Sequence, residues 1–167
     1  MNNEMFLEFD AVSSNEGFAR VAVAAFISPL NPTLEEISDV KTAVSEAVTN
    51  AIIHGYENLS GYGKKRTESE KNRSRDKAAR DKVWLRCRID GNVLHIEVED
   101  KGRGIENIEQ AMEPLFTTKP ELERSGMGFA FMEAFMDDLE VESVLGEGTR
   151  VLMKKKISAG PWIVDEE

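Results

Sequence analysis

The sequence contains a single cysteine, two histidines and no long apolar run, and each shortage excludes a class of protein. One cysteine, Cys87, cannot form an internal disulfide framework and fits a reducing compartment. The histidines and the cysteine show none of the ligand spacings of a zinc site. No apolar run approaches the ~20 residues that span a bilayer, and the start of the chain lacks the basic and apolar regions of a signal peptide. We therefore expect a cytoplasmic protein that does not enter a membrane.

Acidic residues outnumber basic ones, but unevenly along the chain. The net charge of -10 over 167 residues argues against a nucleic-acid binder and favours solubility or basic protein partners. Residues 64–82 carry nine basic and four acidic side chains. We interpret this basic insertion, near 61–81, as a solvated loop or a charged helical extension. A docking surface for an acidic partner is the less favoured alternative, because the segment lacks interleaved aromatic residues and has little apolar content.

Hydrophobic periodicity predicts a mixture of short strands and helices. Strand patterns fall at residues 5–11, 83–89, 93–100, 139–144 and 149–155. Helical patterns follow residue 13 and fall at 34–54, 108–112 and 126–136. We expect one α+β domain at 1–157, a two-layer sandwich of a mixed, mainly antiparallel sheet with helices on one face, and a peripheral tail at 158–167.

Two motifs predict where the first two helices begin. Ser13-x-x-Glu16 and Thr33-x-x-Glu36 each have the spacing of a capping box, in which two side chains satisfy backbone N–H groups at a helix start. In the first helix, apolar residues recur at helical spacing and predict its buried face: Phe18, Val21, Ala22, Ala25 and Phe26.

Positions 46, 50 and 54 of the second predicted helix form a polar stripe beside its apolar face. They hold Glu46, Asn50 and His54, which we expect to face a cleft. An asparagine oxygen can bind Mg²⁺, which prefers oxygen ligands and keeps waters beside substrate phosphates. A carboxylate one turn away is placed to accept a proton from an attacking hydroxyl. Taken alone, the stripe is more simply an ordinary polar helix face.

Asp100 ends a predicted strand on the same side as its apolar residues. A carboxylate that points inward needs a hydrogen-bond donor, because an unpaired buried charge is costly. The exocyclic amine of adenine is one candidate donor, and the alternative is a structural aspartate that caps the following turn. Gly102 and Gly104 are compatible with both interpretations, and they would also let a flat base approach the backbone.

Gly126 and Gly128 open a later predicted helix, where backbone amides and the helix dipole form an anion site. A flexible hinge explains two such glycines equally well. The preceding segment contains Thr117, Lys119 and Arg124, as a lid closing over a triphosphate would require. In that position Arg124 would stabilise charge on a transferring phosphoryl group.

Taken in order, these motifs resemble the ATP-binding domain shared by gyrase B, the ninety-kilodalton heat-shock chaperones, sensor histidine kinases and MutL. Residues 46–50 resemble its N box, and residues 100–104, 126–128 and 146–149 resemble its three glycine boxes. Within that superfamily, the segments that are similar to anti-sigma serine kinases of the sporulation type are 15–21, 45–56, 115–129 and 135–138. The basic insertion and the C-terminal tail depart from the family pattern without interrupting a pocket motif.

The resemblance implies a histidine-kinase-like ATPase fold and a homodimer that binds no nucleic acid directly. It also implies binding of a sporulation sigma factor (sigma F-like), which is kept from RNA polymerase, and phosphorylation of a serine on an anti-anti-sigma protein with MgATP. By this resemblance Glu46 is the base, Asn50 the Mg²⁺ ligand, Arg124 a contact of the γ-phosphate and Arg20 a partner contact. The implied nucleotide contacts are Asn50, His54, Asp100, Gly102, Gly104, Ile105, Thr117, Lys119, Ser125, Gly126, Met127, Gly128, Phe129 and Thr149.

Four other functions remain as alternatives. An anti-sigma kinase of a stress pathway is the nearest, and a nucleotide-gated binding module without catalysis is the second. The catalytic fragment of a sensor histidine kinase fits poorly, because His54 lies in the pocket helix and His95 on a strand. A DNA-processing ATPase is disfavoured by the acidic charge.

Overall fold

The computed structural model describes residues 1–56, 81–113 and 127–158. Within them, five strands form one sheet in the order β1-β2-β3-β5-β4. The strands in this order are β1 (Asn2–Asp10), β2 (Lys82–Asp90), β3 (Val93–Asp100), β5 (Gly148–Lys156) and β4 (Asp138–Val144). The helices are α1 (Ser14–Ile27), α2 (Leu34–Asn50), α4 (Ile108–Met112) and α5 (Gly128–Phe135), with a 3₁₀ turn at Ser28–Leu30 and a π-helical turn at Ala51–Gly55.

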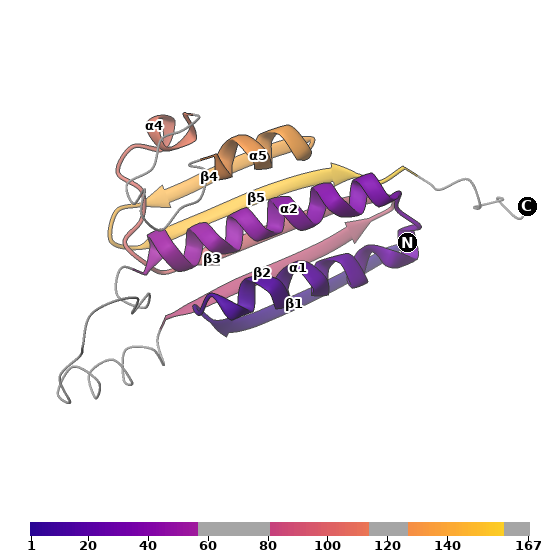
Figure 1. Ribbon diagram of the computed structural model, residues 1–167, viewed down its shortest axis with the longest axis horizontal. Helices are drawn as coiled ribbons and strands as arrows, with labels where there is room; N and C mark the ends of the chain where they lie inside the picture. Colours follow the sequence, from indigo (N-terminus) through magenta and orange to yellow (C-terminus); the bar gives the residue numbers. More distant parts are fainter. Residues whose placement is uncertain (57–80, 114–126, 159–167) are drawn as a thin grey trace, which may run out of the picture.

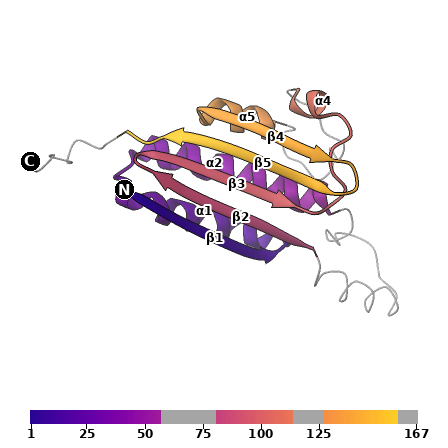
Figure 2. The same ribbon diagram turned by 180° about the vertical axis from the view of Figure 1, so that it is seen from behind.

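The predicted two-layer α+β architecture is confirmed. Helices α1, α2 and α5 lie on one face of the sheet (Figure 1), and the view from behind shows the opposite sheet face (Figure 2). All four strand pairings of the described residues are antiparallel, so this part of the sheet is not mixed. None of the described helices has the length and apolar character needed to cross a membrane.

Helix α1 begins where it is predicted to begin, but both its cap and its buried face differ from the prediction. Ser13 has a helical backbone conformation and makes no side-chain cap hydrogen bond, so the predicted capping box is wrong. Phe18 and Val21 are 53% and 58% exposed and Ala25 is exposed too, whereas Phe26 is partly buried and packs against the core as predicted. The buried residues of α1 are Ala19, Val23 and Ile27. These residues lie four apart along one stripe, where the small Ala19 side chain lets the helix approach its neighbours closely.

Helix α2 is the central helix of the layer and follows its prediction. The Thr33 N–H donates to the Glu36 carboxylate at 2.8 Å, and the Glu36 N–H donates to the Thr33 hydroxyl at 3.2 Å, which confirms this capping box. Val40, Val44 and the alanines beside them pack onto the sheet. The helix continues into the π-helical turn that ends at Gly55. Such turns are rare and frequent at functional sites.

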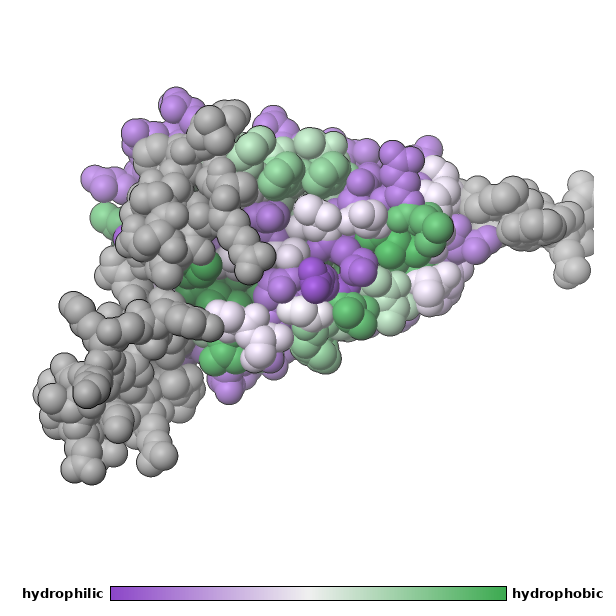
Figure 3. Space-filling view, viewed as in Figure 1, coloured by the Kyte–Doolittle hydropathy of each residue, from purple (hydrophilic) through white to green (hydrophobic). Residues whose placement is uncertain are grey.

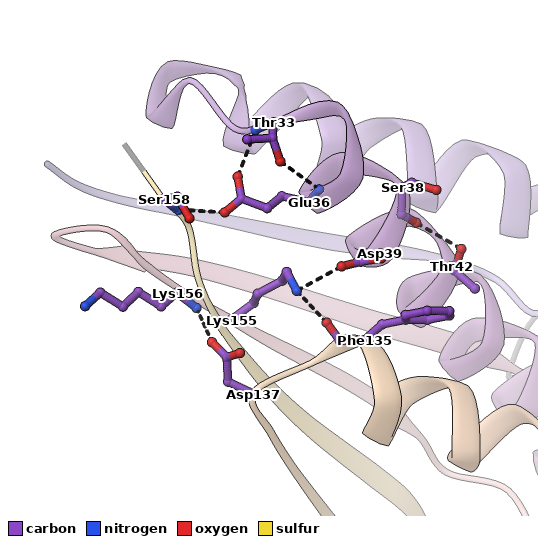
Figure 4. A network of polar contacts seen from close by, with 10 residues as sticks. All are labelled: Thr33, Glu36, Ser38, Asp39, Thr42, Phe135, Asp137, Lys155, Lys156 and Ser158. Carbon is purple, nitrogen blue, oxygen red and sulfur yellow. Dashed lines mark hydrogen bonds and ion pairs between the residues drawn. The ribbon is translucent and has the colours of Figure 1, made fainter. Parts of the chain in front are cut away.

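Polar contacts join the N-terminus of α2 to the C-terminal ends of α5 and β5 (Figure 4). Lys155 donates to the Asp39 carboxylate at 3.1 Å and to the Phe135 carbonyl at 2.6 Å. Glu36, which is 8% exposed, also accepts the Ser158 N–H at 2.7 Å. Burial by itself raises the pKa of Glu36, but the hydrogen bonds from Ser158 and Thr33 bring it below its usual value. These contacts fix the helix layer to the sheet at the end opposite Gly55.

Candidate nucleotide-binding site

A cavity of about 800 Å³ lies where α2 and β3 end, next to α4 and the start of α5. Its volume falls within the range that holds nucleotide-sized ligands. Eight residues that the sequence predicts to bind nucleotide line this cavity: Asn50, His54, Asp100, Gly104, Ile105, Gly128, Phe129 and Thr149. The fold therefore brings together residues from four separated segments of the chain.

Asp100 is the last residue of β3 and is 5% exposed, as its strand parity predicts. Its Oδ1 accepts the Gly102 N–H at 2.9 Å, and its carboxylate also accepts the backbone N–H of Thr149. Burial raises the pKa of Asp100 to about 6 against the opposing effect of these two hydrogen bonds. At neutral pH the group is mainly ionised, so a ligand in the cavity gains by donating a hydrogen bond to it.

The loop that follows Asp100 is fixed to neighbouring segments by backbone hydrogen bonds. The Arg103 N–H donates to the Gly55 carbonyl at 2.9 Å, and the Gly146 N–H donates to the Arg103 carbonyl at 2.7 Å. The Ile105 N–H donates to the Ser143 hydroxyl at 2.8 Å. The cavity wall is therefore held by the π-helical turn after α2 and by the β4–β5 hairpin.

Ser143 also determines the orientation of a hydroxyl group in the cavity wall. Its oxygen lies 2.9 Å from the Gly148 carbonyl and 2.9 Å from the Thr149 hydroxyl. The carbonyl can only accept, so the single Ser143 proton goes to Gly148. The Thr149 hydroxyl must therefore donate to Ser143, which leaves the Thr149 oxygen as an acceptor.

Gly102 and Gly104 allow close packing of the backbone around the cavity. A Cβ at Gly102 would lie 1.9 Å from the Gly55 carbonyl oxygen, and one at Gly104 would lie 2.2 Å from the Val144 carbonyl oxygen. Gly104 also has a φ of +73°, which disfavours other residues. These close backbone contacts require glycine at both positions, and the sequence alone does not reveal that requirement. Their approach to a flat base stays a prediction.

Glu46 and Asn50 meet at the start of α5. Both carry side-chain atoms within 3.2 Å of the point where a Cβ of Gly128 would lie, Glu46 with its Oε2 at 3.1 Å. Asn50 lines the cavity, and Glu46 lies beside it without being part of the lining. The absence of a side chain at position 128 therefore makes room for a carboxylate and an amide next to each other.

The remaining predicted site residues are not in the cavity lining of the described chain. Met127 comes immediately before α5. Arg20 lies on α1 with its side chain 46% exposed, and it pairs with Glu16 at 3.6 Å. Five predicted residues lie outside the described residues: Thr117, Lys119, Arg124, Ser125 and Gly126. Their roles stay predictions.

The donor set fits a Mg²⁺ ion that arrives with a nucleotide. Among the residues that the structure describes, no three acidic, histidine or cysteine side chains gather as a self-sufficient metal site. A Mg²⁺ ion in a nucleotide site needs only one or two protein oxygens, because phosphates and waters supply the rest. The Asn50 side chain offers one such oxygen in the cavity, and the Glu46 carboxylate lies close to it.

Several lining residues escape prediction from the sequence. Ser143 shares its strand face with Leu139 and Val141, and a hydroxyl in an apolar series is a signal that could have identified it. Arg103 is the only lysine or arginine among the described lining residues, and nothing in its spacing distinguishes it. Glu109 of helix α4 places a negative charge at the edge of the cavity. The sequence does not predict this contact, because it depends on where the fold places the helix.

Comparison with known proteins defines the class of this domain. The profile of the histidine kinase-like ATPase domain matches residues 13–155. The crystal structure of the RsbU and RsbW domains of Rv1364c from Mycobacterium tuberculosis superposes with a TM-score of 0.60 over 94% of this chain and 32% of that chain. Its sequence is 18% identical, so this likeness concerns the fold alone.

Curated relatives narrow the class to one family. The anti-sigma F factor of Clostridium acetobutylicum is 55% identical over 158 residues, which cover 95% of this chain and 96% of the relative. The anti-sigma F factor of Anoxybacillus flavithermus is 51% identical over 159 residues, or 95% of each chain. The chain therefore belongs to the anti-sigma F factor family of histidine kinase-like ATPase domains.

Proposed function

We propose that this protein is an anti-sigma factor that binds a sporulation sigma factor of the sigma F type and uses MgATP to phosphorylate a serine of an anti-anti-sigma protein. Relatives named anti-sigma F factor support the first activity. The observation that supports the use of ATP in the second is the buried, ionisable Asp100 at the wall of a nucleotide-sized cavity. Such a group favours a ligand that brings a donor, and the exocyclic amine of adenine is one.

The base would be recognised by acceptors from two neighbouring strands. Asp100 and Thr149 are paired across β3 and β5. The Asp100 carboxylate and the Thr149 oxygen are both acceptors, and an exocyclic amine has two N–H groups to donate. Guanine presents a carbonyl oxygen at the equivalent ring position. The pair would therefore accept ATP and repel GTP.

Phosphoryl transfer would take place at Glu46 and Asn50. Asn50 would hold Mg²⁺, which when bound would neutralise negative charge on the phosphates. Glu46 lies next to Asn50 and would accept the proton of the acceptor serine at a carboxylate oxygen. We assign nucleotide and phosphate contacts to Thr117, Lys119, Arg124, Ser125 and Gly126, with Arg124 at the γ-phosphate.

Partner binding would use α1. Arg20 is partly exposed, and Phe18 and Val21 expose apolar surface on the same helix. Hydrophobic side chains are visible among polar ones on this face of the molecule (Figure 3). Arginine and aromatic side chains are enriched at protein interfaces. The cytoplasmic location belongs to the same proposal, because the sigma factor acts with RNA polymerase in the cytoplasm. The homodimer is also part of the proposal, and it rests on the family resemblance.

One experiment tests both activities. The protein is incubated with labelled ATP and Mg²⁺, a sigma factor of the sigma F type, a stress-response sigma factor, and a cognate anti-anti-sigma protein. We expect capture of the first sigma factor and label on a serine of the anti-anti-sigma protein. Capture of the stress factor instead would assign the protein to that pathway, and capture without labelled serine would make it a binding module without catalysis.

A further inference from the structure

The side chain of Glu16 joins the two helices that carry the proposed docking and catalytic residues. The motif that predicts Glu16 as part of a helix cap is not formed, because Ser13 makes no side-chain cap hydrogen bond. Glu16 instead accepts a hydrogen bond from the Ser45 hydroxyl of α2. The same Oε1 atom lies 3.6 Å from Arg20, one turn along α1. One carboxylate oxygen thus contacts the proposed partner residue and the second helix.

Ser45 and Glu46 face different neighbours from the same turn of α2. Adjacent residues on an α-helix point about 100° apart. The Ser45 hydroxyl reaches α1, and the Glu46 carboxylate reaches the start of α5 at Gly128. The contact between Glu16 and Ser45 is therefore one residue away from the proposed base, and it fixes the turn that carries this base relative to α1.

We propose that Glu16 is a positioning residue that couples docking of the protein substrate at Arg20 to the placement of Glu46. The inference rests on the proposed function. A substrate docked on α1 meets the base in a fixed geometry only if α1 and α2 keep their relative position. The hydrogen bond from Ser45 to Glu16 adds to the apolar packing that holds the two helices together. The ion pair between Glu16 and Arg20 sets how much positive charge α1 offers to an acidic group of a partner.

These two contacts of Glu16 predict separable kinetic effects. Ser45→Ala removes the hydroxyl and keeps the ion pair, so kcat for phosphorylation of the anti-anti-sigma protein should fall about 3- to 10-fold with KM for that protein within about twofold. Glu16→Gln keeps an acceptor for Ser45 and removes the charge opposite Arg20, so KM should fall about 2- to 5-fold, because Arg20 attracts the partner more strongly. A purely structural role would not divide the effects in this way.

The experiment measures initial rates of serine phosphorylation with the wild-type protein and with Ser45→Ala, Ser45→Thr, Glu16→Gln and Ser13→Ala. Ser45→Thr keeps a hydroxyl and should restore kcat. Ser13→Ala is the matched control, because Ser13 makes no side-chain cap hydrogen bond, and its rates should equal those of the wild type. Affinity for a fluorescent ATP analogue and circular dichroism are measured for every variant to separate positioning from loss of the nucleotide site or of the fold.

The outcomes separate this inference from the proposed function. The positioning role would be overturned if Ser45→Ala had the same kcat as the wild type, or if Ser45→Thr did not restore the kcat that Ser45→Ala loses. The proposed function would still stand as long as the wild-type protein phosphorylates serine. If Ser45→Ala does not fold, a Glu16→Gln variant with unchanged KM overturns the coupling by itself. A wild-type protein that transfers no phosphate to serine would overturn both.

Discussion

Asp100→Asn is expected to stabilise the protein without nucleotide while weakening its nucleotide binding. Burial raises the pKa of Asp100 from 3.8 to about 6, and a tenfold change in proton affinity corresponds to about 1.4 kcal/mol. Near pH 7 the buried charge therefore costs the folded state about 3 kcal/mol. Asparagine has the same shape without the charge, and its single oxygen can still accept the Gly102 N–H that Asp100 binds. Its NH₂ group cannot accept a hydrogen bond, so any loss of the Thr149 N–H contact would offset part of this gain at every pH.

Proton linkage gives the sign of the pH dependence. Well below pH 4 Asp100 is protonated in the folded and the unfolded state, so the difference in stability between the wild type and the variant should no longer depend on pH. As the pH rises toward about 6, the folded state holds the proton more tightly than the unfolded chain, so wild-type stability falls relative to Asp100→Asn. The variant should gain up to about 3 kcal/mol by pH 7, which raises Tm by about 6 to 12 °C.

Thermal unfolding between pH 4 and pH 8, followed by circular dichroism, measures this difference. Asp90→Asn makes the same substitution at the exposed end of β2 and should show no such gain. Titration with a fluorescent ATP analogue should show an affinity about 10- to 100-fold lower for Asp100→Asn, because a charge-assisted hydrogen bond is lost. A variant without extra stability at pH 7 would refute the cost of the buried charge, and unchanged affinity would refute the role of Asp100 in reading the base.

Three further substitutions test the site and its support. Glu46→Ala should lower serine phosphorylation at least about 100-fold with ATP-analogue affinity nearly unchanged, and normal turnover would reject it as the base. Gly102→Ala should lower the free energy of unfolding in urea by about 2–4 kcal/mol, since a Cβ would meet a backbone oxygen at 1.9 Å. Its control Gly17→Ala, in α1 with open space, should be neutral or stabilising by about 0.5–1 kcal/mol. Lys155→Met should destabilise by about 1–3 kcal/mol in the same assay, because it removes two hydrogen bonds at a partly buried site, while the exposed Lys156→Met should change little.

The sequence predicts the parts of the fold in which local pattern and tertiary environment agree. Asp100 follows an alternating strand, so its inward direction can be deduced from parity alone. The capping box at Thr33 depends on neighbouring residues only, and it forms as predicted. The eight predicted residues that line the cavity belong to motifs whose order along the chain is typical of the family.

Tertiary contacts explain why other predictions are wrong or missing. Phe18 and Val21 are predicted to be buried but are exposed, because the fully buried stripe of α1 runs through Ala19, Val23 and Ile27, while Phe26 packs at its edge as predicted. Glu16 is predicted to cap its own helix, yet it bonds Ser45, which is 29 residues away in the sequence. The requirement for glycine at position 102 comes from the backbone of Gly55, on a different segment. None of these contacts is visible in local spacing.

Nucleotide selectivity tests the central claim most directly. ATP and GTP are each titrated, with Mg²⁺, against a fluorescent ATP analogue bound to the wild-type protein and to Asp100→Asn. If the buried carboxylate of Asp100 reads the exocyclic amine of adenine, the wild type should prefer ATP at least about 100-fold, because guanine turns a carbonyl oxygen toward a negative charge. The variant should lose most of that preference. Equal affinity of the wild type for ATP and GTP, or failure to bind either, would contradict the assignment of this cavity as an adenine nucleotide site.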